Sequence, residues 1–304
     1  MTDLLLEPLR LPYMQRAMAE VLLLGVLTGA AGVFVVLRRL AFMTDALTHT
    51  VFPGVVIAHL AGWSLAVGAL AFGVLTAVLL TILAANRRVA SDTAIAIVLT
   101  ALFSVGVLLV SRQRSYTSDL TLFLFGRILT VDRADLLTTL VLTVVVLTAL
   151  AVIGKELLLR SFDPEGATAM GYPGVALDLA LNLLIALVVV AAVKAVGTVL
   201  VVAMLIVPAV SARLLAGRVA GMTVLACLFG VLAGWGGLLI SYHLSVSGGV
   251  RLAAGATIVV VLVAGFLAIL AATTVRRRRS QPERPQRLGG SGGAKFAPSV
   301  DQAS

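Results

Sequence analysis

Charged residues are scarce in this chain of 304 residues: they make up 12% of it, whereas 60% of its residues are hydrophobic. The mean hydropathy is +1.10. A soluble domain carries about a quarter charged residues, so the composition argues against an ordinary soluble enzyme and indicates a polytopic membrane protein. The net charge of +9 does not indicate nucleic-acid binding, because the basic residues cluster at the ends of apolar runs, where they set membrane orientation.

Cysteine is nearly absent, and so are the motifs of catalysis. Cys227 is the single cysteine; it lies inside an apolar run and excludes an intramolecular disulfide framework and a CxxC metal site. The sequence contains no GxxxxGK[ST] phosphate loop and no soluble segment long enough for a nucleotide domain. No Ser/His/Asp or Cys/His arrangement indicates hydrolysis. The chain is therefore not expected to be an enzyme.

Long apolar runs dominate what is present. A transmembrane helix needs about 20 mostly apolar residues, and the sequence predicts an all-α membrane protein with eight to nine such helices over residues 17–275. Residues 1–16 are expected to form an amphipathic lead-in, and residues 276–304 a basic, disordered tail. The run 119–131 is too short to cross and is interpreted as re-entrant or interfacial. The nine candidate segments are 17–37, 46–62, 64–86, 93–111, 135–154, 174–193, 196–215, 220–242 and 253–275.

Lysine and arginine at the ends of these segments predict the orientation. If nine helices alternate, most basic clusters fall on one side, which is then cytoplasmic; the amino terminus is outside and the carboxyl terminus inside. The segment 112–134 does not fit, because its four arginines fall on the outer side. Either this segment folds back into the protein or the number of helices differs by one.

One acid and one histidine stand out inside the apolar part of the chain. Ionisable residues in a membrane span are costly and are functional candidates by default. Asp45 and His49 are four residues apart and share a helix face, and a carboxylate with an imidazole suits Mn, Fe or Zn. Pro53 and Gly54 follow and could break the helix, which would free backbone carbonyls to line a cavity. The alternative is an interfacial Asp45 that caps a helix beside a histidine that reaches to the interface.

Two ligands do not complete a transition-metal site, which needs about four. His59 would lie about 15 Å from His49 along an unbroken helix and is expected outside the same coordination shell. His243 and Asp178 are weaker metal candidates, because each also fits a position at the membrane boundary. Lys194 is expected to extend to the interface. A dimer would supply a second acid and a second histidine, and so four ligands.

The stretch "DPEGATAMG" has the signals of a short helix between two spans. Asp163 is expected at the N-cap, Pro164 at the first helical position and Gly171 as terminator, within a segment of about 160–174. A compact helix with a small-residue face could dock in a groove of another protein. The alternative is an ordinary loop.

Four stretches together resemble the membrane permease subunit of bacterial ABC importers for divalent metals, the family that serves zinc, manganese and iron. They occur in the family's order and span most of residues 20–216. Thr44 stands where glycine is usual, Thr48 and Thr50 replace small residues, and Lys194 replaces a neutral polar residue. The four stretches are "LRRLAFMTDALTHTVFPGVVIAHLAG", "TLFLFGRILTVDRADL", "SFDPEGATAMG" and "VKAVGTVLVVAMLIVPAVSARLLA".

The resemblance implies a homodimeric permease in the bacterial plasma membrane. Two copies of a separate cytoplasmic ATPase would drive it, and an extracytoplasmic metal-binding protein would deliver the ion. The metal (Mn, Zn or Fe) would be cargo, with no permanently bound cofactor. Asp45 and His49 match the family's DAxSH core and become pathway ligands. The residues that match the family's ATPase-coupling loop are Asp163, Pro164, Glu165, Gly166, Ala167 and Gly171.

Three other functions remain open at this point. A proton-coupled secondary metal transporter would work without an ATPase and would favour an inverted repeat with paired broken helices. A non-transporting membrane scaffold would not need Asp45 or His49. An ABC permease for a metal chelate would need a wider, aromatic-lined cavity, and only 6% of the residues are aromatic.

Overall fold

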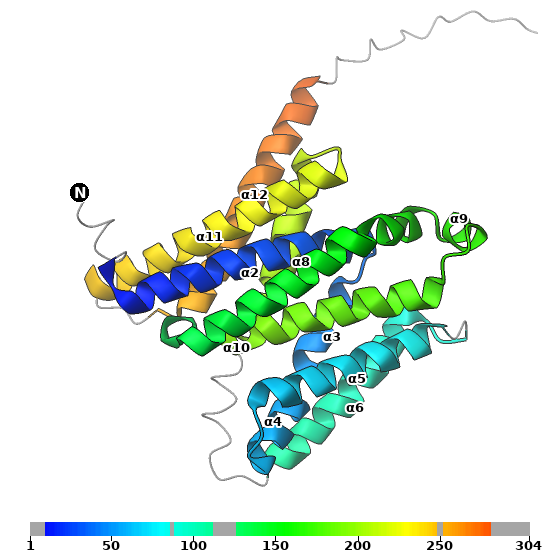
Figure 1. Cartoon of the computed structure of the whole chain (residues 1–304). Helices are drawn as coiled ribbons and strands as arrows, with labels where there is room; N and C mark the ends of the chain where they lie inside the picture. The colour runs from blue at the N-terminus through cyan, green and yellow to red at the C-terminus, as the bar shows by residue number, and fades with distance from the viewer. Residues whose placement is uncertain (1–9, 86–87, 112–125, 248–251, 281–304) are drawn as a thin grey trace, which may run out of the picture.

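The computed structural model describes residues 10–85, 88–111, 126–247 and 252–280, and within these ranges every regular element is a helix (Figure 1). Eight helices of the described chain are long and apolar enough to cross a membrane, with α3 and α4 taken as one span. The predicted all-α class is confirmed. The helices are α2 (Pro12–Leu37), α3 (Ala41–Thr50), α4 (Phe52–Ala61), α5 (Leu65–Ala85), α6 (Ser91–Val110), η1 (Ile128–Thr130), α8 (Arg133–Phe162), α9 (Pro164–Ala169), α10 (Gly174–Leu215), α11 (Val219–Ser247) and α12 (Ala254–Ser280).

The helix α10 explains why nine predicted segments become eight helices. It joins the predicted segments 174–193 and 196–215 in 42 residues, which would be roughly 63 Å if straight, about twice the thickness of a bilayer core. Gly197 interrupts it with φ 75° and ψ 167°, which is not helical. Glycine adopts this conformation without the steric cost that a Cβ would add.

The two halves of α10 run in opposite directions along α2. Asp178, early in the first half, contacts Arg38 just after α2 ends. Lys194, late in that half, contacts Asp135 where α8 begins. The second half then returns, and its residues cluster with Val33 near the end of α2. The molecule therefore has two ends, here called the α9 end and the opposite end (Figure 1). The α9 end is the one that the basic residues predict to be cytoplasmic.

The turn at Gly197 is covered by the segment that was expected to fold back into the protein. Gly126, with φ 69°, packs against the backbone of Val196 and Gly197. The N–H of Arg127 donates a hydrogen bond to the carbonyl of Ala195 at 3.0 Å. Of the predicted run 119–131, only the part from Gly126 is described, and this part lies against the protein at the opposite end.

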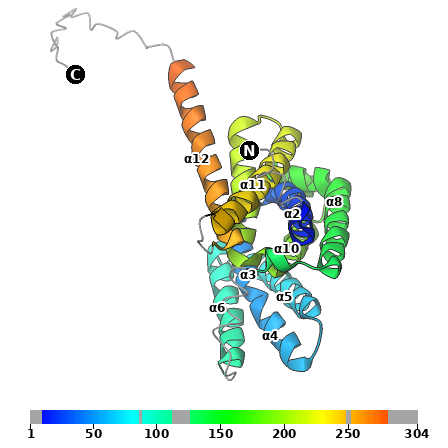
Figure 2. The same ribbon diagram turned by 90° about the vertical axis from the view of Figure 1, so that its left-hand side faces the viewer.

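The helix α2 lies at the centre of the bundle, with α8, α10 and α11 around it (Figure 2). Its glycines allow this close packing. A Cβ on Gly29 would collide with the backbone of Cys227 in α11, and one on Gly32 would collide with the carbonyl of Leu205 in α10. Without water to expel between helices, such close backbone approach is a main source of association in lipid.

Helices extend into both of the segments predicted at the ends of the chain. The helix α2 begins at Pro12, in the expected lead-in, because proline is well suited to the first turn. The helix α12 continues through the basic cluster to Ser280, four residues beyond the expected start of the tail. The remaining parts of the two predictions, residues 1–9 and 281–304, lie outside the described chain.

Candidate metal pathway and coupling helix

Asp45 and His49 lie together on one face of α3, as their spacing predicts. The Nε2 atom of His49 is 3.8 Å from Oδ1 of Asp45, and 33% of the histidine side chain and 43% of the aspartate side chain are exposed. The ring of Phe103 in α6 contacts His49 edge-on, with centroids 5.8 Å apart. Metal bonds to imidazole nitrogen and carboxylate oxygen are about 2 Å long, so a small rotation of either side chain places both atoms on one ion.

A single described chain supplies only two donors here. Across residues 10–85, 88–111, 126–247 and 252–280 there is no group of three His, Cys, Asp or Glu side chains that could hold a metal ion. The half-exposed face of Asp45 and His49 leaves room for further ligands from outside the chain. The predicted four-ligand site between two copies stays a prediction.

The threonines beside the pair bond to the backbone. Thr48 donates to the carbonyl of Asp45 at 2.7 Å, Thr44 to that of Leu40 at 3.0 Å, and Thr50 to that of Leu47 at 3.2 Å. All three threonines are fully buried. The structure therefore shows all three hydroxyls in local hydrogen bonds to the backbone.

The break at Pro53 is milder than expected. Val51 between α3 and α4 is helical, with φ −69° and ψ −27°, so residues 41–61 form one slightly interrupted span. Pro53 has no N–H to donate to the carbonyl of His49, so the helix lacks one backbone hydrogen bond there. Gly54 serves packing, since a Cβ there would collide with the carbonyl of Gly68 in α5.

The three weaker metal candidates lie apart from the pair. His59, exposed on α4, lines a cavity at the opposite end. His243 packs edge-on against Tyr242, and its Nε2 atom is buried without a protein partner in the described chain. Asp178 bonds to two arginines at the α9 end. Its carboxylate is therefore already neutralised by cations, which argues against a metal ligand.

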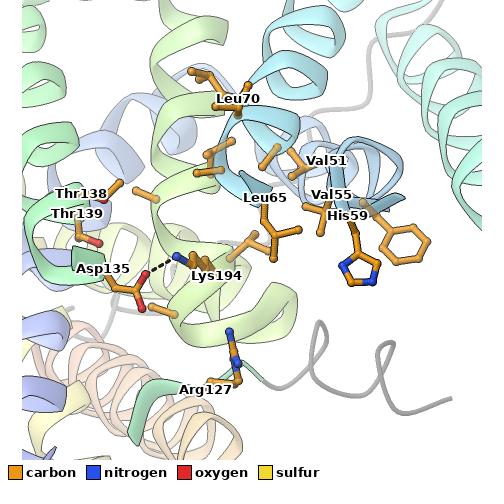
Figure 3. Close-up of a pocket in the computed structure, with 18 of the residues that line it drawn as sticks. Val51, Val55, His59, Leu65, Leu70, Arg127, Asp135, Thr138, Thr139 and Lys194 are labelled. Carbon is orange, nitrogen blue, oxygen red and sulfur yellow. Dashed lines mark hydrogen bonds and ion pairs between the residues drawn. The ribbon is translucent and has the colours of Figure 1, made fainter. Parts of the chain in front are cut away.

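The cavity that His59 lines (Figure 3) also holds two acids, Asp135 and Glu20, that the sequence analysis did not single out. Its volume is about 470 Å³. Asp135 forms an ion pair with Lys194, which was expected merely to reach the interface. Glu20 is fully buried and accepts a hydrogen bond from Thr139 at 2.7 Å. The available signal was that Glu20 is an acid inside the predicted span 17–37.

The short helix expected between two spans is present as α9. Asp163 is its N-cap and accepts a hydrogen bond from the N–H of Gly166 at 2.8 Å, and Pro164 occupies the first turn. A Cβ on Gly166 would collide with that capping carboxylate, so glycine is required. Gly171 ends the turn with φ 85°. These features confirm the predicted helix and its caps.

The surface around α9 is apolar. Ala167 is fully buried beneath it, whereas Glu165 is exposed. Phe162, Met170 and Tyr172 are 69%, 65% and 37% exposed. Large exposed apolar side chains gathered beside a short helix between two spans are typical of a protein interface. The docking of another protein on this segment stays a prediction.

Residues 10–273 match the family described as "ABC 3 transport family". The chain belongs to this family. The resemblance to ABC permease subunits is therefore confirmed. The chain is a multi-pass permease subunit of a bacterial ABC transporter, and it is the transport component rather than the ATPase. Membership in an ATP-driven family also removes the support for a proton-coupled secondary transporter and for a non-transporting scaffold.

Several known proteins are similar over most of their length. "Manganese transport system membrane protein MntC" of Halalkalibacterium halodurans is 42% identical over 259 residues, which are 85% of this chain and 86% of that protein. "Chelated iron transport system membrane protein YfeD" of Yersinia pestis is 36% identical over 242 residues, 80% of this chain and 81% of the relative. A solved structure described as "PsaBC from Streptococcus pneumoniae in complex with Fab" has a TM-score of 0.78 and 35% identity, and the match covers 89% of this chain and 95% of that one.

Proposed function

We propose that this chain is the permease of an ABC importer that carries a divalent transition metal, manganese or iron, into the cytoplasm. The names of the relatives support these two metals, and the ligand chemistry of an aspartate with a histidine also allows zinc. The observation that carries the proposal is the half-exposed pair of Asp45 and His49 on a membrane-embedded helix. An acid in such a place is costly unless it compensates a cation.

In this proposal two copies of the chain face each other across the pathway. Each copy contributes one carboxylate and one imidazole, which together give the four donors that a single chain does not provide. The two carboxylates neutralise the charge of the ion, so that the ion can lose its water within the low-dielectric span. The predicted homodimer is therefore part of this proposal.

Energy enters at the α9 end. Two copies of a cytoplasmic ATPase would dock on α9 and on the apolar residues beside it, and their closure on binding ATP would move this segment. An extracytoplasmic metal-binding protein would dock at the opposite end and release the ion there. No permanently bound cofactor is part of the proposal, and the metal is substrate.

A metal chelate is the second candidate cargo, which the name of the Yersinia pestis relative favours. The cargo alternatives differ in size and in the bonds they require. A free ion needs direct donors such as Asp45 and His49, whereas a chelate arrives with its coordination already filled. Comparison of uptake of the free ion and of its chelate by the same vesicles separates the two.

The test is metal uptake by the reconstituted complex of permease and ATPase, with Asp45→Asn and His49→Ala as variants. Both variants are expected to fold, because both side chains are partly exposed. Each is expected to lower uptake at limiting metal at least tenfold. His59→Ala is the matched control, since this histidine lies outside the pair, and it is expected to keep most of the activity. Normal uptake by both folded variants would refute the assignment of the site.

A further inference from the structure

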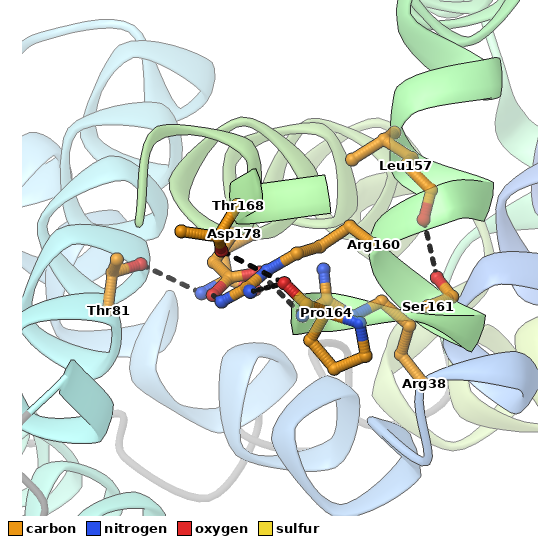
Figure 4. A network of polar contacts seen from close by, with 9 residues as sticks. Arg38, Thr81, Leu157, Arg160, Ser161, Pro164, Thr168 and Asp178 are labelled. Atoms are coloured by element: carbon orange, nitrogen blue, oxygen red, sulfur yellow. Dashed lines mark hydrogen bonds and ion pairs between the residues drawn. The ribbon is translucent and has the colours of Figure 1, made fainter. Parts of the chain in front are cut away.

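One carboxylate at the α9 end joins three helices. Asp178, in the second turn of α10, accepts a hydrogen bond from Nη2 of Arg38 at 2.5 Å through Oδ1, and from Nη2 of Arg160 at 3.2 Å through Oδ2 (Figure 4). The side chains of Arg38, Arg160 and Asp178 are 18%, 19% and 28% exposed. Within the described part of the chain, Asp178 is the one acid that forms an ion pair with either of these two largely buried guanidinium groups.

Arg160 ties this cluster to the coupling helix. Its Nη1 atom donates a hydrogen bond to the carbonyl of Pro164, the first residue of α9, at 3.2 Å. Its guanidinium also lies over Gly174, the first residue of α10, where a Cβ would collide with it. One side chain at the end of α8 therefore holds both ends of the segment that contains α9. A displacement of α9 must move or break this contact.

Arg38 ties the same cluster to the helix that carries the proposed metal ligands. It is the C-cap of α2, and only Arg39 and Leu40 separate it from α3. This junction is tight: Arg39 has a positive φ of 57°, and the N–H of Leu40 donates to the carbonyl of Val35 at 2.8 Å. Asp45 follows about 6 Å along α3, just over one helical turn. Because this junction is tight, a displacement of Arg38 is expected to displace α3 as well.

We propose that Asp178 is a positioning residue that relays the movement of α9, through Arg160 and Arg38, to α3 and its ligand pair. The role of Asp45 and His49 as metal ligands rests on the proposed function. The transmission of movement from α9 to α3 does not. Interfaces of paired charges favour discrete arrangements, because two cations that share one acid lose much of their stabilisation when either contact opens. A position between two sites does not by itself establish coupling. The proposal therefore requires that the response of α3 to ATP change when Asp178 is substituted.

The experiment uses the complex of permease and ATPase in lipid, in a Cys227→Ser background. An environment-sensitive fluorophore is attached through a cysteine at position 42 of α3 or at position 170 beside α9, because Phe42 and Met170 are 46% and 65% exposed. The change in emission on addition of ATP is measured at each position. Without further substitutions, addition of ATP is expected to change the emission at both positions.

Asp178→Asn is expected to keep the response at position 170 and to reduce the response at position 42 at least fivefold. Asn182→Ala is the matched control: Asn182 lies one turn further along α10 and bonds to Thr81 of α5 at 2.8 Å, so its loss opens an interhelical contact that does not involve α9 (Figure 4). This control is expected to leave both responses unchanged. An unaltered response at position 42 in Asp178→Asn, an equal loss in the control, or no response at position 42 before substitution would each overturn the relay.

A second variant decides the matter if Asp178→Asn does not assemble with the ATPase. Arg38→Gln removes only the link to α2 and leaves Asp178 paired with Arg160. It is expected to abolish the ATP-dependent change in emission at position 42 and to keep the change at position 170. A change at both positions would overturn the relay. Metal uptake is recorded in parallel. A complex that transports no metal but shows the dependence on Asp178 would refute the proposed cargo and retain the relay.

Discussion

The ammonium group of Lys194 pairs with the carboxylate of Asp135 across the α8–α10 contact, beside the cavity at the opposite end from α9. The lysine thus offsets the negative charge of Asp135 at the wall of a cavity that also contains the buried acid Glu20. If metal enters here, Lys194 opposes the approach of the cation. Electrostatic steering of this kind acts on association rates and weakens with salt.

We expect Lys194→Gln to raise the uptake rate at limiting metal by about two- to fivefold at low ionic strength, with a smaller effect in high salt. The measurement is the initial rate of metal uptake by proteoliposomes at two salt concentrations. Lys155→Gln, an exposed site on α8 towards the α9 end, makes the same change of charge far from the cavity and serves as the control. A rate for Lys194→Gln that is unchanged at low salt would show that metal does not enter by this cavity.

The features that the sequence predicted are local ones. Asp45 and His49 share a face because they are four residues apart in a helix, and Asp163 caps α9 because its side chain reaches the N–H of Gly166, three residues on. Such relations depend only on helical geometry and on the chemistry of one side chain. They hold whatever the rest of the chain does, so no knowledge of the fold was needed.

The features that were missed depend on contacts between distant residues. Lys194 and Asp135 are 59 positions apart, and Glu20 and Thr139 are 119 positions apart. No periodicity predicts such pairs, and each side chain alone also fits the membrane interface. The reversal within α10 was predicted, because 174–193 and 196–215 were expected as separate spans; the structure adds that a single glycine, Gly197, turns the chain without a polar loop.

Gly32 provides a test of the packing of α2 against α10. Gly32→Ala is expected to destabilise the protein by roughly 1–3 kcal/mol, because its Cβ would collide with the carbonyl of Leu205, and backbone cannot move aside as a flexible side chain can. Gly236→Ala is the matched control inside α11, where a Cβ meets nothing within 4 Å. It is expected to leave stability unchanged or to raise it by up to about 1 kcal/mol. Thermal unfolding in detergent measures both, and equal midpoints for the two variants would contradict the close contact.

Asp132 gives α8 a stability that depends on pH. The backbone N–H of Asp135 donates to its carboxylate at 2.7 Å, and this hydrogen bond lowers the pKa of Asp132 below its ordinary value of 3.8. A group whose pKa is lower in the folded state stabilises the fold above its unfolded pKa and loses this contribution as the pH falls through the folded pKa. The cap is therefore expected to hold at neutral pH and to weaken below pH 3.8.

Asp132→Asn separates the cap from its charge. Asparagine also caps helices well, so at neutral pH this variant should unfold close to the temperature of the unaltered protein, and its stability should depend less on acid. Asp132→Ala should unfold at a lower temperature at neutral pH. The measurement is the unfolding midpoint in detergent between neutral and strongly acidic pH. An identical acid dependence of the asparagine variant and the unaltered protein would show that Asp132 is not the titrating group.

Gly166 provides a test of whether transport depends on the shape of α9. A Cβ at this position would collide with the carboxylate of Asp163 and displace it from the N–H that it caps. Gly166→Ala is therefore expected to distort α9 and to reduce metal uptake per ATP hydrolysed by about tenfold, since a cap lost from so short a helix removes much of what orders it. Because α9 lies outside the bundle, the unfolding temperature should change little.

Gly171→Ala is the control: it strains a left-handed residue by about 1–2 kcal/mol but meets no atom within 4 Å, so it should retain most of the coupling. Equal coupling in both variants would mean that the ATPase does not depend on the shape of α9, and that the drive reaches the membrane helices by another surface.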